Sequence, residues 1–112
     1  MTTADDRDAE GFSVSTRREG ARGVVALVGE LDLHTADELT TAVSVLLEQK
    51  VTRVEVDAGG LSFADSAGLR AVLMARAAAE EAGATFGVTV VSGSVERLIE
   101  ITGLSDLLVE DS

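Results

Sequence analysis

Residues 51–90 encode a strand, a helix and a second strand in succession: VTRVEVDAGGLSFADSAGLRAVLMARAAAEEAGATFGVTV. The segment 51–56 is short and rich in β-branched residues, which predicts a strand. The loop DAGGLSFADS follows, an alanine-rich segment over 66–83 predicts a helix, and residues 86–90 alternate as a strand does. Because a helix connects the two strands, we expect them to lie parallel in one sheet with a right-handed crossover.

Details of this unit give further expectations. The pair Gly59-Gly60 in the loop predicts a turn with positive φ, and Gly83 is a typical helix stop. The residues expected on the inward face of the helix are Leu69, Val72, Leu73 and Ala77.

The segment before this unit predicts a β-hairpin. Residues 12–16 alternate as in a strand, Glu19-Gly20 is typical of a turn, and residues 24–28 form a short apolar run. The acidic residues 1–11 have no apolar pattern, which predicts a disordered tail before a domain over 12–112.

Between the hairpin and residue 51 the apolar period changes to that of a helix. Thr35 is the expected N-cap, with Glu38 as its capping-box partner, and Lys50 lies near the C-terminus. The apolar residues expected on one face are Leu39, Val43, Leu46 and Leu47. We expect Leu46 and Leu73 to lie in the core.

The last part of the chain predicts a short helix and an edge strand. The helix extends from about Ser94 to Thr102, Gly103-Leu104 fits a Schellman motif, and residues 107–109 predict the strand. The whole order, β-β-α-β-α-β-α-(β), predicts a single α/β domain. Its mixed β-sheet of four or five strands starts with the hairpin and carries helices packed on it.

Composition excludes several classes of function. The 112 residues suffice for one domain, and nine basic against 20 acidic residues give a net charge of −11, which disfavours nucleic acid and membrane surfaces as partners. The chain has no cysteine and one histidine, His34, so we expect no metal site and no cofactor. The first residues do not resemble a signal peptide, which favours a cytoplasmic protein.

The pair Asp65-Ser66 at the predicted start of the second helix is the densest polar motif. A helix N-terminus offers free N–H groups and the positive end of the dipole, so a phosphorylated hydroxyl is tolerated there. The alternative is structural: Asp65 or Ser66 is an ordinary N-cap, and Gly68 allows the helix to pack closely on a strand.

A catalytic interpretation of the same residues is disfavoured. The hydrolase elbow G-x-S-x-G lacks its first glycine here, because Ala64 stands in its place, and His34 is the one candidate base. Glu30 and Asp32 form a second acidic pair, which is better explained by the dipole of the first helix than by glycoside chemistry. We therefore expect no catalytic residues and no enzyme.

Three segments, in this order and spacing, resemble the STAS domain of bacterial anti-sigma factor antagonists. They are GELDLHTADEL at 29–39, LSFADSAGL at 61–69 and VERLIEITGL at 95–104. The resemblance covers about residues 12–109. It departs at Ala64, where the family has a larger apolar residue, and in the helix that the family usually carries after its last strand, because this chain stops at Ser112.

The resemblance implies a switch between partners. The unphosphorylated antagonist binds an anti-sigma factor that is also a GHKL-type serine kinase, and a sigma factor is released. The kinase phosphorylates the antagonist, and a PP2C-type phosphatase resets it. The implied phosphoacceptor is Ser66, and the implied partner-binding residues are Glu30, Asp32, Asp65, Ser66 and Gly68. The alternative is a STAS scaffold or phospholipid-transport accessory subunit without this switch.

Overall fold

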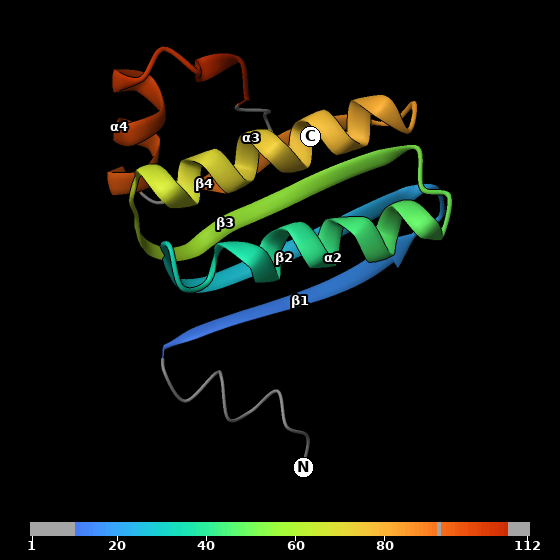
Figure 1. The fold of residues 1–112 in the computed structure, drawn as a ribbon, viewed down its shortest axis with the longest axis horizontal. Helices are drawn as coiled ribbons and strands as arrows, with labels where there is room; N and C mark the ends of the chain where they lie inside the picture. Colours follow the sequence, from blue (N-terminus) through green and yellow to red (C-terminus); the bar gives the residue numbers. More distant parts are fainter. Residues whose placement is uncertain (1–10, 92, 108–112) are drawn as a thin grey trace.

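The computed structural model describes residues 11–91 and 93–107, which form a four-stranded mixed sheet in the order β1-β2-β3-β4 (Figure 1). β1 (Phe12–Glu19) is antiparallel to β2 (Arg22–Leu31), which is parallel to β3 (Arg53–Ala64), and β3 is parallel to β4 (Thr85–Val91). The predicted hairpin and mixed sheet are therefore confirmed. The predicted tail lies outside the described residues, apart from Gly11.

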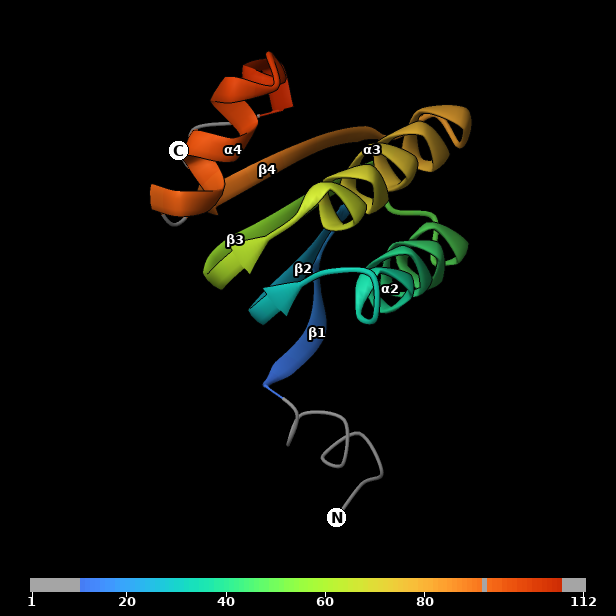
Figure 2. The ribbon, with the colours of Figure 1, turned by 60° about the vertical axis from the view of Figure 1, so that its left-hand side comes forward.

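Three helices pack on this sheet: α2 (Ala36–Glu48), α3 (Ser66–Glu81) and α4 (Gly93–Ile101). Figure 2 shows α2 and α3 side by side along one face. The predicted Schellman motif at the end of α4 is confirmed, because Leu104 N–H donates to the Ile99 carbonyl and Gly103 has a φ of 78°. The predicted last strand is wrong at Leu107, which lies in a 3-10 turn (Ser105–Leu107), and 108–109 lie outside the described residues.

β3 is twice as long as the sequence predicts, because the expected loop continues as strand to Ala64. The predicted turn at Gly59-Gly60 is wrong: neither glycine has a positive φ, and the pairing with β2 shifts register in this region instead. A Cβ on Gly60 would lie 2.8 Å from the Leu27 carbonyl oxygen. The glycine is therefore needed for the close approach of the neighbouring strand, not for a turn.

The core lies between the sheet and the helices. In α2 the expected face is confirmed at Leu39, Val43 and Leu46, whereas Leu47 is half-buried. The face expected for α3 is confirmed at Val72 and wrong at Ala77, which is exposed, while Leu69 and Leu73 are half-buried.

Small side chains explain the rotated face of α3. Its buried stripe is Ala71, Ala75 and Ala79, spaced four residues apart. Alanines let a helix lie close to the layer below it, so the larger leucines of α3 occupy the flanks of the contact.

The opposite face of the sheet carries an ionic cluster. Glu55 lies between the inward-facing Val54 and Val56, so its side chain points to this other face. It is buried between Arg22 and Arg53, which donate hydrogen bonds of 3.0 and 2.7 Å to its carboxylate. The pKa of Glu19, at the edge of this cluster, is lowered mainly by a hydrogen bond from Arg17 and, to a smaller extent, by one from Arg22.

We expect Leu46→Ala to lower the free energy of unfolding by about 2–5 kcal/mol, because the side chain is 1% exposed and fills the space over Gly23. Leu73→Ala is the matched comparison and should cost less, about 1–2 kcal/mol, since Leu73 is half-buried. Urea melts of both variants measure the difference. Equal losses would mean that Leu73 is as deeply packed as Leu46.

Candidate functional site

The site is built where the carboxyl ends of β2 and β3 meet the N-terminus of α3. Asp65 is the N-cap of α3, and its carboxylate accepts a 2.9 Å hydrogen bond from Gly68 N–H. Ser66 is the first helical residue, and its side chain is exposed. Of the two residues predicted as candidate N-caps, Asp65 takes this role, and Ser66 makes no cap and remains exposed.

Gly68 anchors this turn to the sheet. A Cβ at position 68 would lie 2.3 Å from the carbonyl oxygen of Leu31, the last residue of β2. The same oxygen accepts a 3.2 Å hydrogen bond from Asp65 N–H. Gly68 is buried, so it supports the site by packing, as the structural alternative for this glycine predicts.

Ser66 lines a groove between α2 and α3. The side chains that form its walls come from the β2–α2 loop and from both helices: Leu33, Ala36, Asp37, Thr40, Ser66, Ala67, Arg70, Ala71 and Met74. Leu33 is 73% exposed and Met74 55% exposed, so two large apolar side chains flank the serine.

Sequence reasoning missed most of this groove. Leu33, Asp37, Arg70 and Met74 were not among the expected site residues. A signal was present, because Ser66, Arg70 and Met74 are spaced four residues apart and so share one face of a helix. An exposed methionine on that face breaks the usual polar pattern of a solvated helix surface.

Glu30 and Asp32 line a neighbouring hollow rather than this groove. They share it with His34, Thr35 and Glu38, on the other side of the β2–α2 loop. The Asp32 carboxylate is occupied within the loop, where it accepts hydrogen bonds from the backbone N–H groups of His34 and Thr35 at 2.9 and 3.2 Å. Asp32 therefore shapes the loop that presents Leu33.

The predicted capping box at Thr35 is wrong. Thr35 occupies the N-cap position of α2, but its hydroxyl makes no cap hydrogen bond. It donates instead to the Glu30 carbonyl at 2.9 Å and accepts from Asp32 N–H at 2.9 Å. The hydroxyl points back toward the end of β2 because the Glu30 carbonyl and the Asp32 N–H need hydrogen-bond partners in this tight loop.

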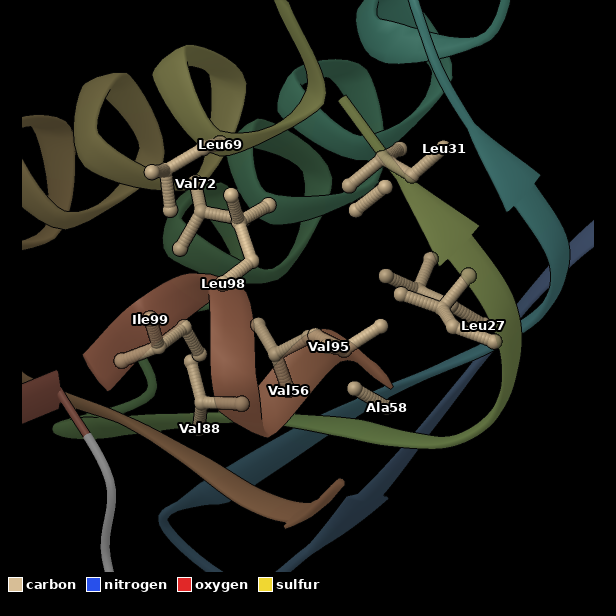
Figure 3. Close-up of a pocket in the computed structure, with 12 residues that line it drawn as sticks. Leu27, Leu31, Val56, Ala58, Leu69, Val72, Val88, Val95, Leu98 and Ile99 are labelled. Carbon is tan, nitrogen blue, oxygen red and sulfur yellow. The ribbon is translucent and has the colours of Figure 1, made fainter. Parts of the chain in front are cut away.

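A small apolar cavity lies in the core formed by the described residues. Its volume is about 20 Å³, and it lies between the sheet, α3 and α4, where Leu69 and Val72 face Val95, Leu98 and Ile99 (Figure 3). Such a volume holds about one water molecule, and the lining gives it no polar partner. Ala64 contributes to this lining, so the small residue that departs from the family pattern lies beside a packing gap.

Groups needed for metal or nucleophilic chemistry do not come together in the described ranges. Ser66 and His34 line different hollows, and no cluster of three metal-ligating side chains occurs among the residues described. Within the same residues, no helix combines the length and apolar character required to cross a membrane. The prominent feature of the site is thus an exposed serine in a surface groove.

Comparison with known proteins places the chain in a family. A family model described as "Mlab, STAS domain" matches residues 14–110. The chain belongs to the STAS domain family. Anti-sigma-B factor antagonists of Staphylococcus aureus and Staphylococcus epidermidis are 31% identical to this STAS domain over 84 residues, 75% of the chain and 78% of each relative. The resemblance to anti-sigma factor antagonists that the sequence motifs indicate is therefore confirmed.

Solved structures show that the STAS domain has the fold of the antagonist SpoIIAA. The unphosphorylated form superposes with a TM-score of 0.77 at 24% identity, over 89% of both chains. The phosphorylated form from Bacillus gives a TM-score of 0.68 at 22% identity, over 90% of this chain and 91% of that one. At this level of identity the likeness establishes the fold.

We expect Gly68→Ala to destabilise the STAS domain by about 1–3 kcal/mol, because the new methyl group would meet the backbone of Leu31, which cannot move aside like a flexible side chain. Gly93→Ala is the matched control, since no heavy atom lies within 4 Å of a Cβ there. Thermal unfolding followed by circular dichroism measures both. A Gly68→Ala protein as stable as wild type would contradict the close approach of α3 to β2.

Proposed function

We propose that this STAS domain is an anti-sigma factor antagonist whose binding is controlled at Ser66. Unphosphorylated, it binds an anti-sigma factor and so releases a sigma factor. The observation that supports this most is the exposed Ser66 hydroxyl in a groove with exposed apolar walls, in a chain 31% identical to anti-sigma-B factor antagonists.

The exposed side chains of Leu33 and Met74 are the proposed anchors of the partner. Large apolar side chains beside a polar rim are typical of protein–protein interfaces. The rim here is acidic, with Asp37 and Asp65 close by and Glu30 and Asp32 in the next hollow. A partner with basic residues around an apolar centre would complement this surface.

Phosphorylation supplies the off-switch in this proposal. The anti-sigma factor acts as a GHKL-type serine kinase: the γ-phosphoryl group of ATP passes to Ser66 Oγ, the hydroxyl proton goes to a base of the kinase, and ADP leaves. A phosphate adds about −1.5 to −2 charges next to Asp65. Like charges brought together at an interface cost several kcal/mol, and a loss of ~4 kcal/mol weakens binding about a thousandfold.

The STAS domain itself needs no cofactor in this cycle. The kinase brings ATP, a PP2C-type phosphatase removes the phosphate, and the setting is the cytoplasm. The domain acts as a non-enzymatic binding protein. Incubation with ATP and the GHKL-type anti-sigma factor of the same organism, followed by intact-mass analysis and peptide mapping, tests the proposal. One phosphate on Ser66 supports it, whereas a phosphate on Ser62 or Thr35, or none, would overturn it.

A second function is favoured by the description of the matching family model, "Mlab, STAS domain". In that alternative, the domain is a scaffold or accessory subunit, for example in phospholipid transport, and Ser66 is only the first residue of α3. The same phosphorylation experiment separates the two functions, since the alternative predicts no phosphate on Ser66.

The switch predicts a clear order of affinities for the anti-sigma factor. Ser66→Ala should bind as wild type does and resist inactivation by ATP, because it keeps a small uncharged surface. Ser66→Asp should bind at least tenfold more weakly, since its charge lies beside Asp65. The matched control is Ser15→Asp, an exposed serine on β1. Titration calorimetry in the presence of ADP or ATP measures the affinity of all three variants for the anti-sigma factor. A Ser66→Asp protein that binds as tightly as wild type would contradict the mechanism.

The apolar anchors give an independent prediction. Leu33→Ala and Met74→Ala should each weaken binding to the anti-sigma factor by about 1–2 kcal/mol while stability changes little, because both side chains are largely exposed in the free protein. Ile101→Ala is the control, since Ile101 is 75% exposed on α4 and does not line the groove. If all three variants bind alike, the interface lies elsewhere.

A further inference from the structure

Arg70 lies one helical turn after Ser66 and lines the same groove. On an α-helix, side chains four residues apart lie on one face, with their Cβ atoms about 5–6 Å from each other. A phosphate on Ser66 extends toward solvent from the first turn, and an arginine side chain is long enough to reach it from the next. The order, anion first and cation four residues later, is the favourable one on a helix.

The guanidinium of Arg70 is available for this contact. Three arginines in the described ranges are already engaged in ion pairs: Arg22 and Arg53 with Glu55, and Arg76 with Glu80 and Asp106. Arg70 is exposed and makes no ion pair or side-chain hydrogen bond among the described residues. Asp37, which lines the same groove, forms no ion pair with Arg70 in the described structure.

Charge makes Arg70 the natural counter-ion of a phosphate here. The groove contains one cationic side chain, Arg70, and the carboxylate of Asp37, while Asp65 lies next to Ser66 in sequence. A phosphate would therefore meet two carboxylates and one guanidinium. Arginine binds phosphate through two parallel N–H···O hydrogen bonds, which are stronger than hydrogen bonds between neutral groups.

We propose that Arg70 binds the phosphate of phosphorylated Ser66 within the same chain, and that the switch consequently changes two charges of the groove at once. The proposal rests on the function proposed above. Unphosphorylated, the groove presents a free guanidinium together with the apolar side chains of Leu33 and Met74. Phosphorylated, the groove presents the negative charge of the phosphate, and the Arg70 guanidinium is already bound to that phosphate. An acidic group of the partner that pairs with Arg70 in the unphosphorylated state therefore loses its contact.

The test uses phosphoserine installed at position 66 by genetic code expansion, so that no kinase is needed. The pKa of the phosphate is followed by ³¹P NMR in wild type, Arg70→Gln, Arg70→Lys and the control Arg97→Gln, which removes an exposed arginine of α4 outside the groove. A nearby cation favours the dianion. We expect the pKa to be about 0.3–0.7 units lower in wild type and Arg97→Gln than in Arg70→Gln.

Two further readouts define the contact. Arg70→Lys should give an intermediate pKa, because lysine keeps the charge but not the fork of donors. In 1 M NaCl the difference between wild type and Arg70→Gln should shrink, since salt screens exposed pairs. One pKa shared by all four proteins would overturn the proposal. That failure is distinct from absence of phosphorylation by the kinase, which would overturn the proposed function and leave the contact intact.

Discussion

The contact between the carbonyl oxygen of Leu31 and the first turn of α3 is the constraint on which the site depends. This oxygen accepts a hydrogen bond from Asp65 N–H, and the space beside it admits no side chain at Gly68. The Asp65 carboxylate then caps the helix through Gly68 N–H. Together these contacts fix the helix start against the end of β2, and Ser66 consequently lies at the surface.

A second consequence is the groove itself. The residues that shape it come from the β2–α2 loop, α2 and α3, and the loop is kept tight by the hydrogen bonds of Asp32 and Thr35. Leu33 is thereby presented in the same groove as Ser66, Arg70 and Met74 of α3. An acidic protein of net charge −11 thus has, at its proposed switch, a small mixed surface of apolar, cationic and anionic groups.

Much of the architecture was predictable from local patterns. Alternation, β-branched runs and glycine stops located all four described strands and three helices, because these signals act over a few residues. The errors have tertiary causes. β3 continues through Gly59-Gly60 because β2 pairs alongside it, and the buried stripe of α3 consists of alanines because neighbouring elements pack closely against it. Neither neighbour is visible in a local window of sequence.

The sequence by itself determined the order of elements, the STAS motifs, and the place of Asp65-Ser66 at the start of the second helix. It also contained the four-residue spacing of Ser66, Arg70 and Met74. The structure decided that Asp65 is the cap and that Ser66 is exposed. Only the tertiary structure decided which partners this face meets: α2 and Leu33 on one side, with Asp32 and Glu30 displaced into the next hollow. The physical reason is that helix periodicity is local, whereas a groove depends on how two elements distant in sequence pack on one sheet.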